Sequence, residues 1–329
     1  NKMIGPTSIG NDKFVFKLDS YGNIKSNVSI VTINGESVSN FVIDNTGYGI
    51  VHETQGTNHF ITRFNLDTGA TEYTTQATLY FPVQALVIDL SNNVIVAGET
   101  GRNNEHRLSQ IYPTGTFDSL FMYAKGLYVG GIVTKSVLYD SDNNLYIIGN
   151  FQVLLNVYHV PTTASPVFTA LSTAVATGSD LPFEAFLIKY DSNRTHVFTK
   201  KPGAGADDYV KQATCALLSK STVVIAGFYF NELYCGETLY RSQGDADAFV
   251  AGYSKTTGDC LWINVLGGSG NDDVTSITVD QDGNVYAVGH HVSSISVGGF
   301  SLTSQSSKNT FLWKITPDGK TADLQRIGS

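Results

Sequence analysis

The sequence predicts an all-β fold, and three observations support that prediction. Pairs of short apolar runs, rich in β-branched and aromatic residues, recur around turns of Asp, Asn and Gly. The composition combines 32 glycines with only 15% charged residues, and no segment shows a helical periodicity of comparable strength. With 329 residues the chain can bury a sizeable core, although its length alone fits either one large β domain or two ordinary domains.

One hairpin motif repeats along most of the chain. An apolar run ends in Asp, a short turn follows, and a second apolar run ends near Gly. Two such runs around an Asp, Asn or Gly turn are the signature of a β-hairpin. The copies carry the following residues at the Asp position, the fourth being degenerate: Asp44, Asp89, Asp140, Leu218 and Asp280.

A second hairpin alternates with the first. It starts with an aromatic residue, often carries a base three positions later, and turns at a Gly before another strand. In the copy that begins at Phe186, Arg194 stands where Gly is expected. The remaining copies begin at Phe14, Phe60, Arg107, Phe249 and Phe311.

The alternation of the two hairpins defines a four-stranded unit, whose strands we name A, B, C and D. Units of about 40 to 50 residues, with extra length in loops, are typical of β-propeller blades. One four-stranded sheet cannot bury both of its faces, whereas sheets stacked around an axis bury them and leave only short edges. We therefore expect one β-propeller domain over residues 1–329, with five full blades and an N-terminal half blade, and we favour a six-blade ring.

Near the C-terminal end, four successive segments form one further pattern. They are Phe249–Tyr253, Leu261–Trp262, Leu266–Asp273 and Asp280–Gly289. Together they resemble the SBBP β-propeller repeat family. The Gly-rich stretch Pro202–Asp208 looks like a second copy of the link at 267–273. The resemblance implies a propeller fold and an extracellular or cell-surface location, and it brings no catalytic residues with it.

The predicted strands do not balance, because there are six C–D hairpins and five A–B hairpins. A chain that continues before Asn1 or beyond Ser329, as a longer protein would, supplies the missing hairpin. Alternatively, a thin sixth blade closes the ring with help from residues 2–9. In a third explanation a neighbouring subunit donates strands and builds a head-to-tail homopolymer. We favour the first two explanations, because closed rings protect their strand edges.

Charge and hydropathy argue against two classes of partner. The formal charge is −8, from 21 Lys and Arg against 29 Asp and Glu, and binding to phosphates needs clustered bases. No apolar run reaches the roughly 18 residues that span a bilayer. We therefore expect neither nucleic-acid binding nor membrane insertion.

Two sequons and three cysteines bear on the compartment. Asn27 and Asn193 stand in Asn-x-Ser/Thr sequons and are glycosylation sites if the chain follows a secretory route. The cysteines Cys215, Cys235 and Cys260 are too few for a disulfide scaffold. One local bridge, Cys235 with Cys260, is one interpretation, and unpaired buried thiols are the simpler one. The weakly charged surface itself favours a secreted protein.

Motifs for catalysis are missing from the sequence. It contains no His-Glu-x-x-His, phosphate-loop or Gly-x-Ser-x-Gly pattern, so we predict no catalytic, cofactor-binding or metal-binding residues and no enzyme activity. Calcium is the one cofactor left open, because Asp140–Asn144 and Asp280–Asn284 resemble calcium loops. Both lack a later bidentate Glu, and turns capped by their own side chains explain them more simply.

Two further features have a structural and a functional interpretation. The Gly-rich links at 202–208 and 267–273 could hold an anion through their backbone N–H groups, but each ends in two Asp residues that would repel one. The pair His290–His291 could bind a metal or act as a base, but no Cys or carboxylate stands at ligand spacing. We expect structural roles for both.

Insertions after strand B are the expected place for specificity, because loops on a rigid scaffold vary without harming the core. They span residues 150–183, 229–246 and 290–308, and we expect them on one face. The favoured function is a non-catalytic extracellular propeller, a structural, adhesive or self-assembling surface protein that binds proteins, copies of itself or glycans through these insertions. One alternative is a glycan-active hydrolase or lyase; another is a ligand-binding sensor domain of a longer receptor.

Overall fold

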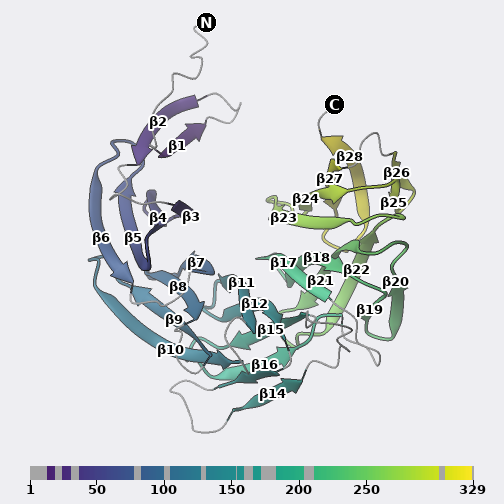
Figure 1. Ribbon diagram of the computed structural model, residues 1–329, viewed down its shortest axis with the longest axis horizontal. Helices are drawn as coiled ribbons and strands as arrows, with labels where there is room; N and C mark the ends of the chain where they lie inside the picture. Colours follow the sequence, from purple (N-terminus) through teal and green to yellow (C-terminus); the bar gives the residue numbers. More distant parts are fainter. Residues whose placement is uncertain are drawn as a thin grey trace, which may run out of the picture. The chain divides into compact units, whose positions relative to one another are not determined.

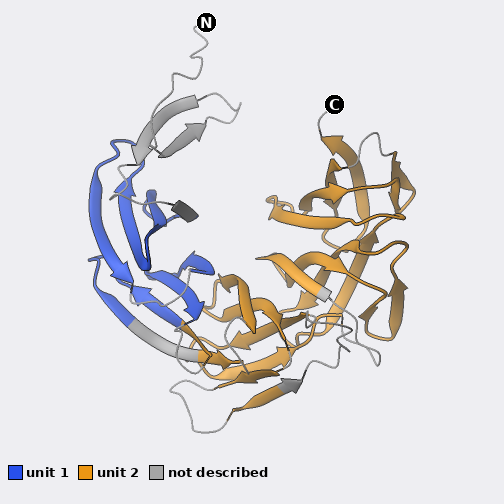
Figure 2. Ribbon diagram, viewed as in Figure 1, with its two compact units in different colours: residues 1–101, 108–120 blue, residues 102–107, 121–329 orange. Residues whose placement is uncertain are grey.

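The computed structural model contains strands, turns and bends, and no α-helix among the residues that it describes. These residues are 13–18, 24–30, 37–77, 83–99, 104–126, 131–152, 154–158, 166–171, 183–203, 211–303 and 308–327. Across these ranges no helix has the length and apolar character that crossing a bilayer requires. The chain divides into two compact units, residues 1–101 with 108–120 and residues 102–107 with 121–329 (Figure 2).

The first unit contains a complete four-stranded antiparallel sheet and a separate hairpin. The sheet has the order β3-β4-β5-β6, with β3 at Ser37–Ile43, β4 at Tyr48–Gln55, β5 at Asn58–Asn65 and β6 at Thr71–Ala77. The hairpin pairs β1 (Lys13–Leu18) with β2 (Ile24–Ile30). It occupies the position predicted for the first C–D hairpin.

The next four strands form a ladder with the order β10-β9-β8-β7 (Figure 1). They are β7 (Ala85–Ile88), β8 (Val94–Glu99), β9 (Glu105–Ile111) and β10 (Phe117–Lys125). The division between the two units passes through β9 and β10.

The second unit contains three four-stranded antiparallel ladders. The first is β11-β12-β15-β16, at Ile132–Tyr139, Leu145–Phe151, Glu184–Tyr190 and His196–Lys200. The second is β17-β18-β21-β22, at Lys211–Leu218, Thr222–Tyr229, Asp247–Ser254 and Cys260–Leu266. The third is β23-β24-β27-β28, at Asp273–Val279, Val285–His291, Asn309–Ile315 and Thr321–Ile327. One parallel bridge, Glu184 to Lys211, joins the first two.

Each repeated Gly near the end of strand B is required by close packing. In the first strand of these ladders the register shifts by one residue, for example between Val274 and Ser276 of β23. A Cβ on Gly289 would lie 2.0 Å from the carbonyl oxygen of Asp273 and 2.6 Å from Cζ of Phe311. Gly149 and Gly227 occupy the same position opposite the same kind of bulge. The repeat therefore combines a β-bulge, a Gly and usually an aromatic ring.

The turn after strand C holds one residue in the left-handed region. Gly69, Gly258 and Gly319 fill that position with φ between 74° and 81°, and Arg194 fills it in the β15–β16 turn with φ 65°. An Arg is strained in this conformation, because its Cβ lies close to the following carbonyl oxygen. Its guanidinium compensates by lying 5.0 Å above the ring of Tyr139 and donating to the carbonyl of Asn143.

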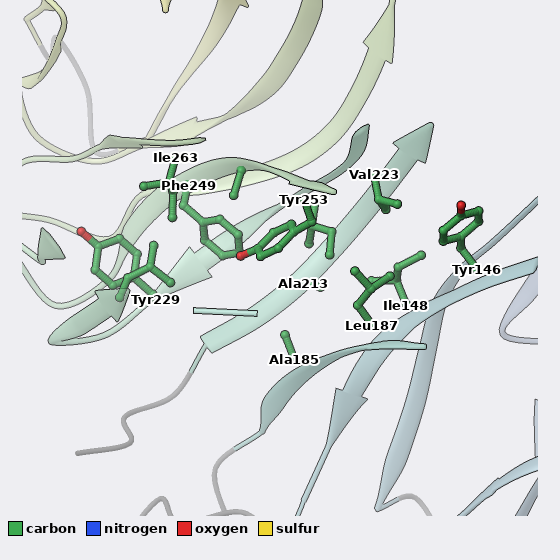
Figure 3. Close-up of a cluster of buried hydrophobic side chains, with 13 residues drawn as sticks. Tyr146, Ile148, Ala185, Leu187, Ala213, Val223, Tyr229, Phe249, Tyr253 and Ile263 are labelled. Carbon is green, nitrogen blue, oxygen red and sulfur yellow. The ribbon is translucent and has the colours of Figure 1, made fainter. Parts of the chain in front are cut away.

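The core of the second unit lies between successive ladders, and the middle strands face both neighbours. Val223, Ile225 and Tyr229 of β18 pack into the cluster shared with β12 and β15 (Figure 3). Val224 and Ala226 of the same strand pack instead into the cluster shared with β24 and β27. Because successive side chains of a strand point to opposite faces, a strand covered on both faces must be apolar throughout.

The prediction of an all-β chain built from four-stranded antiparallel sheets is confirmed. The predicted Asp-turn hairpins correspond to β3–β4, β7–β8, β11–β12 and β23–β24. In the degenerate copy, β17–β18, Ser219 N donates to Thr222 O and closes a shorter turn without an Asp. The prediction of one domain over 1–329 stays a prediction.

Candidate functional site

Three extra hairpins, which we call the rim hairpins, follow the second strand of each ladder in the second unit. They are β13–β14 (Leu154–Val157 and Phe168–Leu171), β19–β20 (Glu232–Cys235 and Thr238–Arg241) and β25–β26 (Ile295–Val297 and Phe300–Leu302). Each lies within a predicted insertion: 150–183, 229–246 or 290–308. In Figure 1, β19–β20 and β25–β26 lie beside β22 and β28, at the outer side of the second unit.

The rim hairpins lie against strands at the open edges of the ladders. Val157 and Asn156 of β13 pair with Ala124 and Lys125 of β10. Ser296 of β25 forms an antiparallel bridge with Gly267, immediately after β22. Strand edges present unpaired N–H and C=O groups, and covering them prevents unwanted pairing. The rim hairpins are therefore folded elements of the scaffold.

A disulfide fixes the second rim hairpin. Cys235, the last residue of β19, is bonded to Cys260, the first residue of β22, with a Cα–Cα distance of 5.3 Å. Leu233 of the same hairpin is buried in the cluster beneath. The remaining cysteine, Cys215, is free, and burial raises the pKa of its thiol to about 11. That thiol stays protonated at neutral pH and is not poised as a nucleophile.

The Gly-rich link between β22 and β23 is held by Asp272. Its carboxylate accepts from the N–H of Gly268 (2.9 Å) and from the N–H of Val292 (3.1 Å). A Cβ on Gly268 would lie 2.0 Å from the carbonyl oxygen of Ser294, so the link packs directly on the following loop. An anion has no place here, because the carboxylate already takes the N–H groups. The structural interpretation accounts for this link; residues 204–208 of the other link lie outside the described residues.

Asp272 belongs to a buried group that also contains Asp247 and His291. All three side chains are at most 1% exposed. Burial is the main reason that the pKa of Asp272 is raised to about 6, and the negative charge of Asp247 adds to this effect. The two N–H donors act in the opposite direction and lower the pKa. Burial also raises the pKa of Asp247 above its ordinary value. Within the part of the chain that the structure describes, Oδ1 of Asp247 and Nε2 of His291 have no hydrogen-bond partner. The sequence indicated neither Asp247 nor this cluster.

His290 and His291 point to different environments. His290 is partly exposed and lies 3.3 Å from Oδ1 of Asp273. His291 is fully buried, and its Nδ1 lies 2.7 Å from the carbonyl oxygen of Ser293. The two rings therefore do not form a joint site. Among the described residues, no group of three His, Cys, Asp or Glu side chains is arranged to hold a metal ion.

The two calcium-like patterns are turns closed by their own side chains. Asp280 Oδ1 accepts from the N–H groups of Asp282 and Asn284, and Oδ2 accepts from the Asn284 amide and the Tyr286 hydroxyl. The hydrogen bonds, above all that from the Asn284 amide, lower the pKa of Asp280, while desolvation opposes them. The turn at Asp140 repeats all four bonds with Asp142, Asn144 and Tyr146. Cation binding would have to displace them.

The base of the second hairpin motif has an aromatic partner beside these turns. Lys314 lies over the ring of Tyr286, and Lys189 lies over Tyr146, each with Nζ 5.3 Å from the ring centre. In the first unit Arg63 lies 3.9 Å above Tyr48 and pairs with Asp44 at 2.7 Å. The base therefore joins strand C to the start of strand B, beside the A–B turn of its own sheet.

Described residues of the second unit surround two hollows that bear on the site. The first, which we call the β22 hollow, has a volume of about 540 Å³. It is lined by Tyr240, Gln243, Ile263, Asn264, Val265, Ser296, Val297, Gly298, Gly299, Phe300 and Ser301. The second, the β24 hollow, has a volume of about 290 Å³ and is lined by Phe228, Phe230, Ala246, Asn271, Asp272, Asp273, His290, Val292 and Lys308. Both are built from insertion residues and the strands beside them.

The two sequons fall on described strands or turns. Asn193 is exposed in the turn between β15 and β16, where its N–H donates to Oδ1 of Asp191. Asn27 lies on β2, and its side chain is outside the described residues. Glycosylation at both positions stays a prediction.

Comparison with known proteins concerns the fold. Residues 261–290 match the SBBP family model, a β-propeller repeat, from β22 through β24. No curated protein sequence matches this chain significantly. A crystal structure of a protein from Lactobacillus plantarum is 12% identical, with a TM-score of 0.50 over 96% of this chain and 77% of that one. The Dos1 propeller is 9% identical, with a TM-score of 0.45 over 95% and 74%.

A structure of Drosophila Semaphorin 1a, extracellular domains 1–2, is 8% identical, with a TM-score of 0.45 over 96% of this chain and 75% of that one. At these identities a likeness concerns the fold and carries no activity. The repeated four-stranded sheets and the family match agree with each other. The protein is thus a β-propeller that carries an SBBP repeat at residues 261–290.

Proposed function

We propose that this protein is a non-catalytic extracellular β-propeller that binds other macromolecules through its rim hairpins. The disulfide between Cys235 and Cys260 is the observation that carries the proposal. It connects a rim hairpin to the scaffold, and disulfides persist in oxidising compartments and are rare in the cytosol. The low charged fraction of 15% fits the same location.

The rim hairpins suit a binding role because their sequences differ from one copy to the next while two of them are attached to the scaffold. The β25–β26 hairpin is attached by the Gly267–Ser296 bridge, and the β19–β20 hairpin by the disulfide. Both border the β22 hollow. Elements that are already ordered lose little conformational entropy on binding, so more of the contact energy appears as affinity.

We assign β1–β2 to the C–D half of a first blade, followed by five full blades. In the described part of the chain β1 pairs only with β2, so its other edge is open to a strand. An added A–B hairpin, from the same polypeptide or from a neighbour, would complete a six-blade ring. This is the feature that allows self-assembly in our proposal.

The buried carboxylates do not favour a glycan-active enzyme. Asp247 and Asp272 are close enough for their charges to interact, but each is at most 1% exposed and accepts backbone N–H groups. A glycosidase needs two carboxyl groups that reach the sugar. Asp272 therefore holds the link, and Asp247 holds the loop before β21.

Thiol labelling tests the location. Full-length protein in its producing cells is acid-quenched, denatured and labelled with a maleimide polymer. We expect one label per chain, on Cys215, and three labels after reduction. Cys235→Ser is the control, because it leaves two reactive thiols before reduction. Three labels on the unreduced native protein would overturn the extracellular assignment.

Attachment of coated beads tests the binding role. Beads carrying the full chain are incubated with surface material of the producing organism, alongside beads carrying albumin. We expect the protein beads to attach, and the double variant Cys235→Ser, Cys260→Ser to attach less because its hairpin is released. Cys215→Ser, which leaves the hairpin fixed, should attach like the unmodified protein. Equal attachment of protein beads and albumin beads would contradict the proposal.

A further inference from the structure

The β22 hollow lies between two successive rim hairpins, and none of the described residues that line it carries a charged side chain. Tyr240 and Gln243 come from the segment around β20, and Phe300 and Ser301 come from β26. The floor is the edge strand β22, through Ile263, Asn264 and Val265. A volume of about 540 Å³ falls within the range of about 300–1,000 Å³ that ligand pockets occupy. We propose that this hollow binds a neutral saccharide.

This inference rests on the proposed binding function and names its ligand. The lining offers two kinds of group that a sugar needs. The rings of Tyr240 and Phe300 line the hollow and are only partly buried, and an aromatic ring is the surface on which the C–H face of a pyranose stacks. The carboxamides of Gln243 and Asn264 and the hydroxyls of Ser296 and Ser301 are donors and acceptors that match sugar hydroxyls. The sequence indicated the insertions 229–246 and 290–308 but not this set, because its members come from three separate segments.

The hollow is held open by contacts at both ends of β22. Cys260, the first residue of β22, is bonded to Cys235 of one rim hairpin. At the other end, Gly267 is bridged to Ser296 of the next rim hairpin. The side chain of Asn264 is oriented by a hydrogen bond from Nδ2 to the carbonyl of Gly319. The walls are therefore in place before a ligand arrives, which lowers the entropic cost of binding.

The glycine pair at the tip of β25–β26 keeps the hollow accessible. Gly298 and Gly299 adopt φ values of 55° and 87°, a conformation that suits Gly at a two-residue turn. A Cβ on Gly299 would meet nothing within 4 Å. Backbone groups at the turn can therefore approach a ligand without obstruction by side chains.

The β24 hollow provides an internal contrast. It is smaller, about 290 Å³, and its lining includes Asp273, His290 and Lys308, which suit charged groups. The β22 hollow lacks such groups, so a phosphate, a carboxylate or a basic peptide would lose its hydration without an ionic partner. An uncharged polyol with one apolar face has no charge to desolvate, so among common ligands of this size it loses the least hydration free energy on entering the hollow.

Saturation-transfer NMR on the full-length protein tests the proposal with a panel of free sugars. The panel contains glucose, galactose, mannose, fucose, N-acetylglucosamine and N-acetylgalactosamine, with glucuronate as the charged control. We expect saturable binding of at least one neutral sugar and no binding of glucuronate. Transfer to none of the neutral sugars, or to glucuronate alone, would overturn the proposal.

Substitutions at Phe300 connect binding to the hollow. Phe300→Leu keeps an apolar side chain but removes the ring, and we expect it to raise the Kd of the sugar about tenfold. Phe300→Tyr keeps the ring and should bind like the unmodified protein. Leu261→Ala is the matched control, because Leu261 is a 55% exposed residue of β22 outside the hollow. Unchanged binding by Phe300→Leu would show that the sugar binds elsewhere.

The two proposals fail separately. If protein beads attach to surface material while no free neutral sugar binds, the binding function stands and the saccharide assignment is wrong. If an extended peptide of alternating apolar residues binds the hollow in place of sugars, shown by line broadening that Phe300→Leu abolishes, the saccharide assignment is also wrong. If the beads do not attach but a sugar binds, the assignment of an adhesive role is wrong and the hollow remains a saccharide site.

Discussion

At the scale of residues, the repeat is maintained by glycines that allow close approach. Gly289 lies under the ring of Phe311 and against the bulged strand, and no side chain fits there. Gly236, at the tip of the β19–β20 hairpin, has φ 60° and open space around its Cβ position. A side chain at Gly289 would therefore be opposed by packing, whereas a side chain at Gly236 would be opposed only by the backbone conformation.

Gly289→Ala should therefore destabilise the fold far more than Gly236→Ala. Overpacking that moves a carbonyl and a buried ring costs about 3 kcal/mol, because neither neighbour can withdraw. A left-handed Ala without steric contacts costs about 1 kcal/mol. Urea unfolding of the two variants at neutral pH measures the difference in free energy of unfolding. Equal losses would mean that backbone conformation, and not packing, selects Gly289.

The buried carboxyl group of Asp272 predicts a pH-dependent stability. Burial raises its pKa to about 6 in the folded protein, whereas an unfolded Asp has a pKa of about 3.9. Between these values the folded state binds more protons than the unfolded state, so the free energy of unfolding falls as pH rises from about 4 to about 6. The loss is at most about 3 kcal/mol, at about 1.4 kcal/mol per pKa unit. It is complete above pH 7.

Other groups titrate in the same range, so the test uses a difference between two proteins. Burial and the nearby His59 lower the pKa of His52 to about 4, and burial lowers that of His106 to about 4. Because the unfolded state then binds more protons than the folded state, both histidines make stability rise with pH. Their effect is opposite to the effect of Asp272. In Asp272→Asn the Asp272 contribution is lost together with its coupling to Asp247, so the unmodified protein should lose stability relative to the variant between pH 4 and pH 7. A constant difference between the two unfolding curves would contradict this assignment.

At the scale of elements, the rim hairpins combine structural and binding roles. β13 pairs with β10, and the β19–β20 hairpin is attached to β22, so each covers part of a strand edge. Leu233 contributes to the core beneath, and Glu232 forms an ion pair with Arg241 within the hairpin. An element that covers an edge on one side is free to vary on the other.

Removing the disulfide tests how much of this attachment is covalent. The bridge closes a segment with a sequence separation of 25 residues, and the loss of that constraint on the unfolded chain costs about 3 kcal/mol. We expect the variant Cys235→Ser, Cys260→Ser to unfold at correspondingly lower urea concentration. A reducing agent should lower the midpoint of the unmodified protein and leave that of the variant unchanged. A midpoint that the reductant does not move would show that the bridge is absent in solution.

The hairpins of the scaffold could be predicted from sequence, and the hollow could not. Asp280 and Gly289 mark their turn and bulge through local chemistry, which repeats at fixed spacing. Arg194 breaks the Gly pattern because its guanidinium stacks on Tyr139, a contact with another strand that no local rule contains. Phe300 and Tyr240 line one hollow although 59 residues separate them from each other. Only the folded positions of two insertions bring them together.

At the scale of the whole molecule, stability comes from contacts between successive sheets. Strand β18 sends alternate side chains into two different clusters, so its sheet is covered on both faces. Neither cluster would be buried if one sheet stood alone. The fourth strand of a sheet is different, because β28 lies at the edge of its sheet and only one of its residues is buried.

In each complete sheet, amide hydrogen exchange should be slower in the inner strands than in the fourth strand. Seven of the eight residues of β21 are buried, whereas one of the seven residues of β28 is. Exchange from buried strands requires loss of the packing on both faces, while an outer strand can open by itself. We expect amides of β12, β18 and β21 to exchange about 100-fold or more slowly than those of β28. Exchange measured by mass spectrometry on short peptides of the full-length protein resolves these strands. Equal protection of β28 and β21 would mean that the sheets open as rigid units, and the stability could then not be assigned to the faces between them.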